Sequence, residues 1–416
     1  MTSKTCSNWK IFGLNLWQQV VVAMILAIIA GLILKEHALC LKIFGDIFIK
    51  LIKMIVAPLI FFALITGITS LAEGRHFKRI ALKGTIAYIL TSMLAAVAGL
   101  LLASFFPPGV GISAPSAGGG DLSPAPVSTT ASIGDFLMSL IPHNIVNAMA
   151  DDLYLQIVVF AVFTGIVINS IRGETEKVKQ LSAEIARIMF KMIEWVVRTS
   201  PLAVFGFIAA MVGTTGTDVI MALLKLVSLV IAACALQYCL FGLILYLFGR
   251  ISPMPFYKKM VSTQLMAFST SSSKATLTLA MKELQNKMGV SKSTSNFMMP
   301  LGACINMDGT AIYLGICAVF FSQLYGIPLH FHDYIMLMLT CTLGSIGAAG
   351  MPSGSILFMG MVLHSVGLPF EGVAMLLGVD RILDMFRTTV NITGDAAITL
   401  LVDKTEGTLN ESVYYG

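Results

Sequence analysis

The sequence predicts an all-α integral membrane protein with eight transmembrane helices and two re-entrant helical hairpins. Hydrophobic residues make up 56% of its 416 residues and charged residues only 12%. The mean hydropathy is +0.86, far from the values of soluble globular proteins. Apolar segments long enough to cross a hydrocarbon layer of about 30 Å follow one another up to residue 249. After Pro253 the apolar segments become shorter and polar clusters interrupt them. We therefore expect six spans first, then hairpins that alternate with two further spans.

The first six spans are expected at residues 14–35, 42–72, 81–106, 135–171, 185–212 and 218–249. Several of these segments exceed a single crossing, so we expect them to be tilted or broken. Residues 107–133 are rich in Pro, Gly and Ser and are predicted to form a flexible extracellular loop. Lysines and arginines gather in short connections, at Arg75, Lys78, Arg79 and Lys83 and again at Arg250, Lys258 and Lys259. This pattern predicts a multi-pass protein of the plasma or inner membrane with those connections and both termini in the cytoplasm.

The seven cysteines form no C-x-x-C pair and mostly lie inside apolar segments. We therefore expect no disulfide and no cysteine metal site. Nothing in the sequence indicates a cofactor or a nucleic-acid partner, and membrane lipid is the expected surrounding. The first apolar run is not followed by a small-residue cleavage site, so we expect it to remain as an anchor.

Two polar clusters interrupt the second half of the chain in the same way, FSTSSSKAT at 268–276 and GSIGAAGMPSG at 344–354. Their apolar flanks of about a dozen residues are too short to cross, so each is predicted to be the tip of a re-entrant hairpin. The hairpins are expected at residues 256–290 and 332–367, and the helices that follow them at 294–325 and 370–403. This alternation indicates an internal inverted repeat. Helix N-termini at the tips would favour an anion, although serines also commonly fill turns.

The last of these helices carries ionisable residues that lipid would not tolerate. Its polar residues are Asp380, Arg381, Asp384, Arg387, Asn391 and Asp395. At about 100° per residue, all of them except Arg381 fall on one face. A charge at the bilayer centre costs about 2.5 to 3.5 kcal/mol, so this stripe must face protein, water or ions. One interpretation is a structural ion pair between Asp384 and Arg387. The other is a site for a zwitterion and small cations, which needs both charge signs and neutral oxygens.

The helix expected at 294–325 contains the polar sequence NMDGT at residues 306–310. Gly309 and its short polar neighbours allow local unwinding, which frees backbone carbonyls. Freed carbonyls together with Asp308 would make a hard-oxygen site suited to Na⁺. The alternative is a helix kink whose polar groups are bonded locally.

Together, NMDGT at 306–310 and D-x-x-x-D-M-x-R-T-x-x-N-x-x-G-D at 380–395 resemble the dicarboxylate/amino acid:cation symporters, a family that includes glutamate and aspartate transporters. The resemblance covers nearly the whole chain. It implies an elevator-type glutamate transporter fold, a homotrimer in which a scaffold holds a mobile transport unit. The implied scaffold comprises residues 1–80 and 134–215, the implied transport unit 81–106 and 216–405, and the C-terminal tail 406–416.

The resemblance also implies roles for individual residues. The implied substrate contacts are Ser272, Ser273, Thr310, Met351, Ser355, Asp384, Arg387, Thr388 and Asn391. Asp384 would hold the substrate ammonium and Arg387 its side-chain carboxylate. The implied sodium ligands are Tyr88, Thr91, Ser92, Gly302, Asn306, Asp308, Asn391 and Asp395. A further cation site would use carbonyls near Cys304, Ser345, Ile346 and Ala348.

Three positions depart from the family pattern. Serines around Ser271 stand where archaeal members have an arginine. Arg381 beside the stripe is a candidate to supply the equivalent positive charge to the substrate. Lys274 is unusual at a hairpin tip. Leu314 stands where proton-coupled animal members have a glutamate, which favours Na⁺ coupling over H⁺ coupling.

We therefore expect a secondary active symporter for L-glutamate and/or L-aspartate, driven by a cation gradient, with Na⁺ favoured, and no enzyme activity. Arg387 together with Asp384 matches the second carboxylate and the amine of such substrates. The alternatives are the same fold carrying neutral amino acids or C4-dicarboxylates, or coupled to protons. A serine hydrolase that uses the serine-rich tip with His364 as its base is disfavoured, because no G-x-S-x-G elbow occurs at residues 271–273. An ion channel is disfavoured because paired opposite charges would trap ions.

Overall fold

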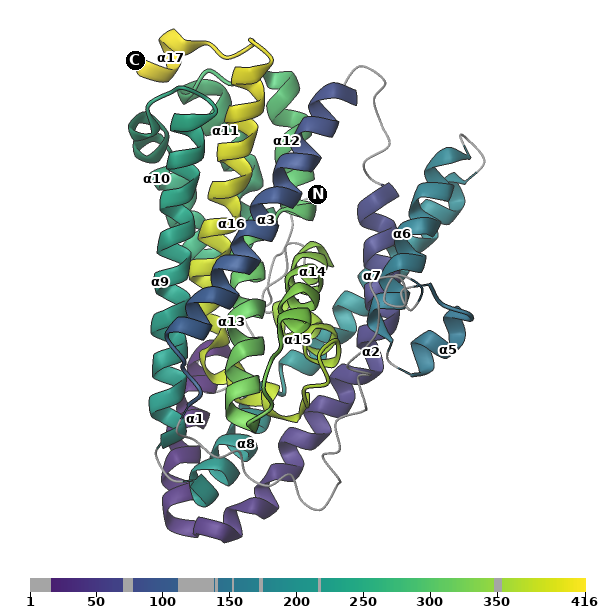
Figure 1. The fold of residues 1–416 in the computed structure, drawn as a ribbon, viewed down its shortest axis with the longest axis vertical. Helices are drawn as coiled ribbons and strands as arrows, with labels where there is room; N and C mark the ends of the chain where they lie inside the picture. The colour runs from purple at the N-terminus through teal and green to yellow at the C-terminus, as the bar shows by residue number, and fades with distance from the viewer. Residues whose placement is uncertain are drawn as a thin grey trace.

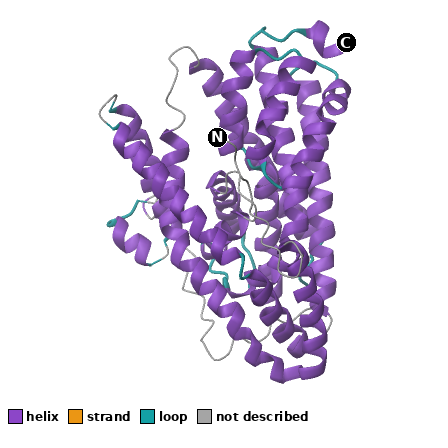
Figure 2. Ribbon diagram, turned by 180° about the vertical axis from the view of Figure 1, so that it is seen from behind, coloured by secondary structure: helices purple, strands orange, loops and turns teal. Residues whose placement is uncertain are grey.

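The structure is a computed structural model, and it describes residues 16–69, 78–110, 138, 141–151, 153–171, 175–215, 218–347 and 354–416. These residues form helices and connections, and none of them belongs to a strand (Figures 1 and 2). The first half contains α1 (Leu16–Leu34), η1 (Lys35–Leu41), α2 (Lys42–Thr69), α3 (Lys78–Phe105), α5 (Ile145–Ala150), α6 (Tyr154–Ser170), α7 (Glu176–Val197) and α8 (Ser200–Thr215). The second half contains α9 (Asp218–Leu247), α10 (Pro253–Thr270), α11 (Ser273–Lys287), α12 (Lys292–Ile305), α13 (Asp308–Tyr325), α14 (Phe331–Gly347), α15 (Gly354–His364), η3 (Glu371–Leu376), α16 (Leu377–Thr405) and α17 (Glu411–Tyr415).

The helices pack in two groups (Figure 1). In one group, α13 and α16 form the centre, surrounded by α3, α9, α10, α11, α12, α14 and α15. In the other group, α2 packs on α6, α7 and α8, and α1 packs on α8. The groups meet where α8 contacts α9 and η3 and where α2 contacts η3 and α14. The polar stripe of α16 therefore lies in the group formed mainly by the second half of the chain.

Two of the apolar segments expected as single spans are each divided into two helices. The segment at 135–171 contains α5 and α6, and the side chain of Asn144 caps α5 by accepting a hydrogen bond from the Val146 backbone N–H. The segment at 185–212 contains α7 and α8, whose axes are bent by 51°. Pro201 lies in the first turn of α8, where its missing N–H costs no helical hydrogen bond. Long apolar segments were expected to be tilted or broken, and these two are broken.

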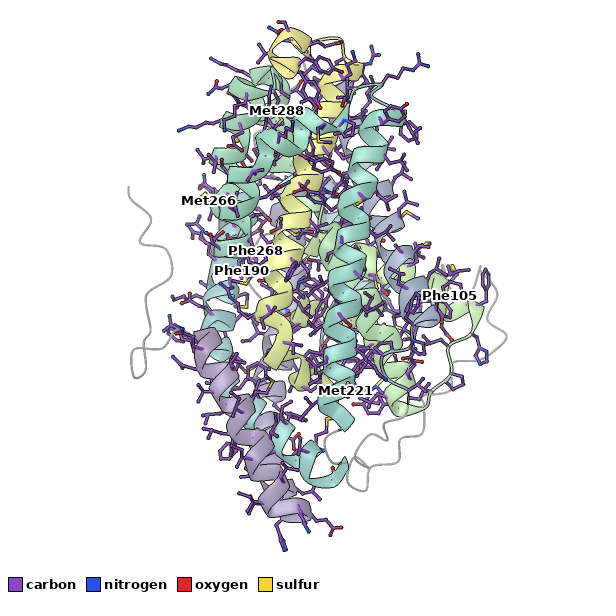
Figure 3. The ribbon with its side chains drawn as sticks, turned by 90° about the vertical axis from the view of Figure 1, so that its left-hand side faces the viewer. Phe105, Phe190, Met221, Met266, Phe268 and Met288 are labelled. Carbon is purple, nitrogen blue, oxygen red and sulfur yellow. The ribbon has the colours of Figure 1, made fainter. Side chains whose placement is uncertain are left out.

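Four helical stretches of the described residues are long and apolar enough to cross a membrane, or five if the bent pair α7–α8 is counted as one span. The first stretch contains both α1 and α2, which diverge from η1 (Figure 1). Helix α16 has the length of a span, but its stripe makes it too polar to be recognised by composition. Large apolar side chains cover the outside, including Ile33, Phe105 and Phe248 at 73%, 75% and 71% exposed; Figure 3 shows Phe105 projecting outward. This surface is typical of a membrane protein, and the count of eight spans stays a prediction.

The first predicted hairpin is a pair of helices, α10 and α11, joined by two serines. Ser271 ends α10 in the left-handed region, with φ +50°. Ser272 then caps α11 by accepting a hydrogen bond from the Ala275 backbone N–H at 3.3 Å. Serine suits this turn because its hydroxyl satisfies a free N–H at the start of a helix. The second predicted hairpin corresponds to α14 and α15, and its tip at residues 348–353 lies outside the described residues.

The two helix pairs begin at opposite ends of α16. At the C-terminal end of α16, the turn after α11 contacts the tail, where the Asn410 N–H donates to the Gly289 carbonyl at 2.9 Å. At the other end, α14 begins near the end of α3, where the hydroxyls of Ser104 and Tyr334 lie 2.8 Å apart. The opposed entry of the two pairs is what an inverted repeat requires.

Candidate functional site

The stripe of α16 is buried inside the first group of helices. The exposed fraction is 7% or less for Asp380, Asp384, Arg387, Thr388, Asn391 and Asp395. Arg381 lies off the stripe, and its side chain is 31% exposed. Because the stripe faces protein and not the outer surface, its charges must be compensated by neighbouring groups. Two polar clusters surround these groups: an ion-paired cluster around Arg387, and a cluster around Asp395 whose donors are neutral.

Arg387 is the centre of the first cluster. Its Nη2 donates to Oδ1 of Asp380 at 2.8 Å and to Oδ1 of Asp384 at 3.0 Å. The guanidinium carbon lies 4.1 Å from the centre of the Tyr313 ring, within cation–π distance. Arg381 approaches Asp384 from the outside, with Nη1 3.9 Å from Oδ2. The ion pair that the structural interpretation required is therefore present, and Asp380 is part of it.

The ion pairs leave part of the guanidinium unused. Among the described residues, Nε and Nη1 of Arg387 have no hydrogen-bond partner, and neither does Oδ2 of Asp380. Buried donors of a charged group are rarely left unpaired, because the loss costs more than 1 to 3 kcal/mol. A charged N–H donor forms a strong hydrogen bond with a carboxylate. The N–H groups on Nε and Nη1 of Arg387 are thus available to donate to a carboxylate group of a ligand.

The second cluster forms where the helix of the NMDGT motif is interrupted. Helix α12 ends at Ile305 and α13 begins at Asp308, with Asn306 and Met307 in non-helical conformations between them. Asn306 donates from Nδ2 to Oδ1 of Asp395 at 2.9 Å, and its Oδ1 accepts from the Thr91 hydroxyl at 3.2 Å. The predicted unwinding is confirmed, and it begins at Asn306, before Gly309.

Residues of α3 complete this cluster from the opposite side. The Ser92 hydroxyl donates to Oδ1 of Asp308 at 2.8 Å. The Tyr88 hydroxyl donates to the Met298 carbonyl at 3.1 Å and lies 3.3 Å from the Asp395 carbonyl. Oδ2 of Asp395 has no hydrogen-bond partner among the described residues. The cluster brings two buried carboxylates together with neutral oxygens, a donor set that fits a small hard cation such as Na⁺.

Asn391 connects the two clusters. Its Oδ1 accepts from the Gly309 backbone N–H at 2.8 Å, and its Nδ2 lies 3.1 Å from the Met307 sulfur. A Cβ on Gly309 would lie 2.8 Å from the Cα of Arg387, so only glycine allows α13 to approach α16 this closely. The interruption is therefore in direct contact with the helix that carries Arg387.

For the remaining predicted site residues, the structure gives burial but few contacts. Thr310, Thr388, Ser273, Ser345 and Ser355 are buried, and Ser272 and Cys304 are partly buried. The hydroxyl of Ser355 has no hydrogen-bond partner among the described residues, whereas Ser345 donates to the Thr342 carbonyl. Phe268 of α10 packs edge-on against Phe386 of α16, with 5.2 Å between ring centres, so the first pair contacts α16 at the residue before Arg387. Ala348 and Met351 lie outside the described residues, and the side chain of Ile346 is partly buried.

Comparison with known proteins identifies the protein family. The model of the sodium:dicarboxylate symporter family matches residues 16–405. The chain belongs to this family. It is 34% identical to the proton/glutamate-aspartate symporter of Escherichia coli (strain K12), over 93% of this chain and 92% of that protein. It is 32% identical to the proton/sodium-glutamate symport protein of Bacillus subtilis (strain 168), over 96% and 94%. It is also 30% identical to the C4-dicarboxylate transport protein of the same Bacillus strain, over 96% and 95%.

The family predicted from the two motifs is confirmed. Members of the sodium:dicarboxylate symporter family are membrane-embedded transporters and not enzymes, so this symporter moves a small solute together with a cation. The names of the relatives specify either glutamate and aspartate or C4-dicarboxylates as the solute, and protons or sodium as the cation.

Sequence reasoning missed three side chains that the structure brings into the clusters. Asp380 was assigned to the stripe but given no role, although its spacing of seven residues from Arg387 places it on the same helix face. Tyr313 lies under the guanidinium, and the motif at 306–310 ends before it. Gln237 of α9 donates from Nε2 to Oδ2 of Asp308 at 3.0 Å. A single amide within an apolar helix has no sequence pattern that would have marked it.

Proposed function

We propose that this symporter is a secondary active transporter that takes up L-glutamate and/or L-aspartate, coupled to a cation gradient with Na⁺ as the coupling ion. The observation that carries the proposal is that Nε and Nη1 of buried Arg387 have no partner among the described residues, with Asp384 one turn away on the same buried face. An acidic amino acid has one more carboxylate than a neutral one, and it has an ammonium that a C4-dicarboxylate lacks. Arg387 binds the first of these groups and Asp384 the second.

The other substrate contacts proposed here surround those two side chains. Thr310 and Thr388 are both buried to 5% exposure, and with Asn391 they bind the α-carboxylate and amine. Main-chain groups at Ser272, Ser273, Met351 and Ser355 close the site, because N–H groups at helix N-termini favour an anion. Arg381 is a secondary charge partner whose contact with Asp384 is longer and more exposed.

The cation ligands proposed here are the oxygens of the second cluster. Asp308 and Asp395 supply the negative charge; Asn306, Thr91, Ser92 and Tyr88 supply neutral oxygens, and Gly302 contributes its carbonyl. A Cβ on Gly302 would lie 2.7 Å from Oδ1 of Asp395, so glycine is required for the main chain to approach the carboxylate. Carbonyls near Cys304, Ser345, Ile346 and Ala348 form a further site. When bound, a cation offsets the charge of the buried carboxylates, and Asn391 links that change to Arg387.

The two groups of helices support an elevator mechanism in a homotrimer. We assign residues 1–80 and 134–215 to a scaffold, and residues 81–106 and 216–405 to the unit that moves with the substrate. The end of α16 that carries Glu406 faces the cytoplasm in this proposal. Lys83 pairs with Glu406 there and Lys259 binds the tail, so two of the basic connections meet at this end.

The alternative solute is a C4-dicarboxylate, whose carboxylates Arg387 could also bind. Curated relatives named as C4-dicarboxylate transport proteins cover 96% of this chain at 30% and 32% identity. Asp384 argues against that solute, since a buried carboxylate next to Arg387 repels an anion that brings no ammonium.

Uptake by proteoliposomes tests the proposal. The full chain is reconstituted, and uptake of labelled aspartate is followed with an imposed Na⁺ gradient and, separately, with an imposed H⁺ gradient. Excess glutamate, succinate or serine competes in parallel samples. We expect uptake driven by the Na⁺ gradient and competition by glutamate only. Competition by succinate or serine would reassign the solute, uptake driven by H⁺ alone would reassign the ion, and current without substrate would favour a channel.

A further inference from the structure

Gln237 is the only polar contribution of α9 to the second cluster among the described hydrogen bonds, and it lies in an otherwise apolar stretch between Cys234 and Phe241. It is 2% exposed. Its Nε2 donates to Oδ2 of Asp308 at 3.0 Å, whereas its Oε1 has no hydrogen-bond partner in the described part of the chain. A purely structural amide would be expected to use both ends, because a buried acceptor without a donor costs about 1 to 3 kcal/mol.

Asp308 is held by helices on both sides. Ser92 of α3 donates to Oδ1 and Gln237 of α9 donates to Oδ2, so each carboxylate oxygen has a neutral donor. Asp308 itself is fully buried. Neutral donors orient a buried carboxylate but do not cancel its charge, and a charge in this position is stabilised chiefly by a counter-ion.

We propose that Gln237 is a ligand of the coupling cation at Asp308, through an amide that can present either end. In the geometry seen here Nε2 holds the carboxylate. With a cation beside Asp308, a half-turn of the amide about its last side-chain bond places Oε1 where Nε2 now lies, and a neutral oxygen joins the ion's coordination shell. The proposal rests on the cation coupling proposed above, and it extends the site to α9, a helix that the sequence motifs do not reach.

The chemistry of the amide explains why glutamine serves here. Its terminal amide carries both a donor and an acceptor without a charge, on separate atoms that a half-turn exchanges. A glutamate could bind the ion but would repel Asp308 when no ion is present. A lysine would neutralise Asp308 permanently and remove the need for a cation.

Sodium-dependent thermal stability of the purified full-length chain tests this role. Unfolding temperature is measured without substrate over a series of Na⁺ concentrations, with choline replacing Na⁺ at constant ionic strength. Gln237→Met keeps the length and removes both polar atoms; we expect its half-saturating Na⁺ concentration to rise about tenfold. Gln237→Glu keeps an oxygen and loses the donor; we expect a half-saturating concentration equal to or below that of the wild type. Gln264→Met removes a partly buried amide, which contacts Tyr238 and Thr393 instead, and should leave the Na⁺ dependence unchanged.

The pattern across the variants decides the outcome. A half-saturating concentration within twofold of the wild type in Gln237→Met would overturn the proposal, as would an equal rise in Gln237→Met and Gln237→Glu. If Gln237→Met does not fold, Gln237→Asn withdraws the amide by one methylene and should show the same rise. No stabilisation of the wild type by Na⁺ would also overturn it. Because no substrate is used, failure of acidic amino acid uptake would leave this readout intact and count only against the proposed solute.

Discussion

Arg387 makes its shortest ion pair with Asp380, two helical turns earlier on α16, and not with Asp384 of the intervening turn; the Nη2–Oδ1 distances are 2.8 and 3.0 Å. One nitrogen, Nη2, serves both carboxylates, which fixes the guanidinium and leaves Nε and Nη1 without a partner among the described residues. The guanidinium is thus held by α16 itself and by the Tyr313 ring beneath it. Asp380 lies two turns and Asp384 one turn before Arg387, so we expect the two carboxylates to have different roles.

Arg387→Cys should abolish the uptake of acidic amino acids. The substitution removes the group that binds the extra carboxylate and leaves Asp380 and Asp384 buried without their cation, so we expect a loss of at least about 30-fold, or about 2 kcal/mol. Uptake of labelled aspartate and of labelled serine in proteoliposomes measures the effect, with serine uptake retained or gained. Arg381→Cys is the matched control; its side chain is 31% exposed and we expect a smaller loss. Retained aspartate uptake in Arg387→Cys would contradict the assigned role.

Asp384→Asn should change which solutes are carried. The amide keeps the size of the side chain and a hydrogen bond acceptor for Arg387, but it removes the charge that binds an ammonium. We expect the apparent affinity for aspartate to fall about tenfold or more, while succinate, which has no ammonium, competes better than in the wild type. Competition of each solute against labelled aspartate measures this ratio. An equal loss for both solutes would indicate that Asp384 acts only as the partner of Arg387.

Gly302→Ala should weaken the response to Na⁺. The new Cβ would lie 2.7 Å from Oδ1 of Asp395 and 2.8 Å from the Tyr88 hydroxyl, neither of which can retreat freely. We expect a higher half-saturating Na⁺ concentration and a loss of about 1 to 3 kcal/mol in stability, measured by thermal unfolding over a Na⁺ series. In the control Gly378→Ala, the nearest contact of the Cβ is the flexible end of Met24 at 3.2 Å, with Val204 at an ordinary 3.7 Å, and little change is expected. Unchanged Na⁺ dependence in Gly302→Ala would place the cation elsewhere.

The elements that sequence predicted well are those in which polar residues conflict with an apolar surrounding. The serine tip between α10 and α11 and the interruption at Asn306 were visible because such residues have no place in a lipid-facing helix. The contacts across helices were not visible in the same way. Gln237 is separated from Asp308 by 71 residues, and only packing of α9 against α13 brings them together. The segment that contains α7 and α8 was expected to be tilted or broken because of its length, but the place of the break was not predicted, and Pro201 lies just after it.

Glu406→Gln should remove a pH-dependent contact between α16 and α3. Lys83 donates to Oε1 of Glu406, and Nε of Arg79 lies 3.3 Å from the same oxygen. The hydrogen bond from Lys83 and the two positive charges hold the pKa of Glu406 below its ordinary value. A carboxyl with a lowered pKa in the folded state stabilises it above the unfolded pKa, and this contribution disappears as the pH falls through the folded pKa. The unfolding temperature of Glu406→Gln should therefore lie below that of the wild type at neutral pH, and the two should converge in acid. A constant difference at every pH would exclude this origin.

Tyr414→Ala should destabilise the end of the protein where the tail closes over α10 and α11. Tyr414 is fully buried, and its hydroxyl donates to the Ser252 carbonyl at 2.7 Å. Lys259 donates to the carbonyls of Val413 and Tyr414 at 2.9 and 2.8 Å, so the tail is held by both side chain and main chain. Removing the ring leaves a cavity and an unpaired carbonyl, for which we expect a loss of about 3 kcal/mol, measured by thermal or denaturant unfolding. Tyr415→Ala removes the neighbouring ring, which is 53% exposed, and should cost much less. Equal effects of the two substitutions would show that burial of Tyr414 does not anchor the tail.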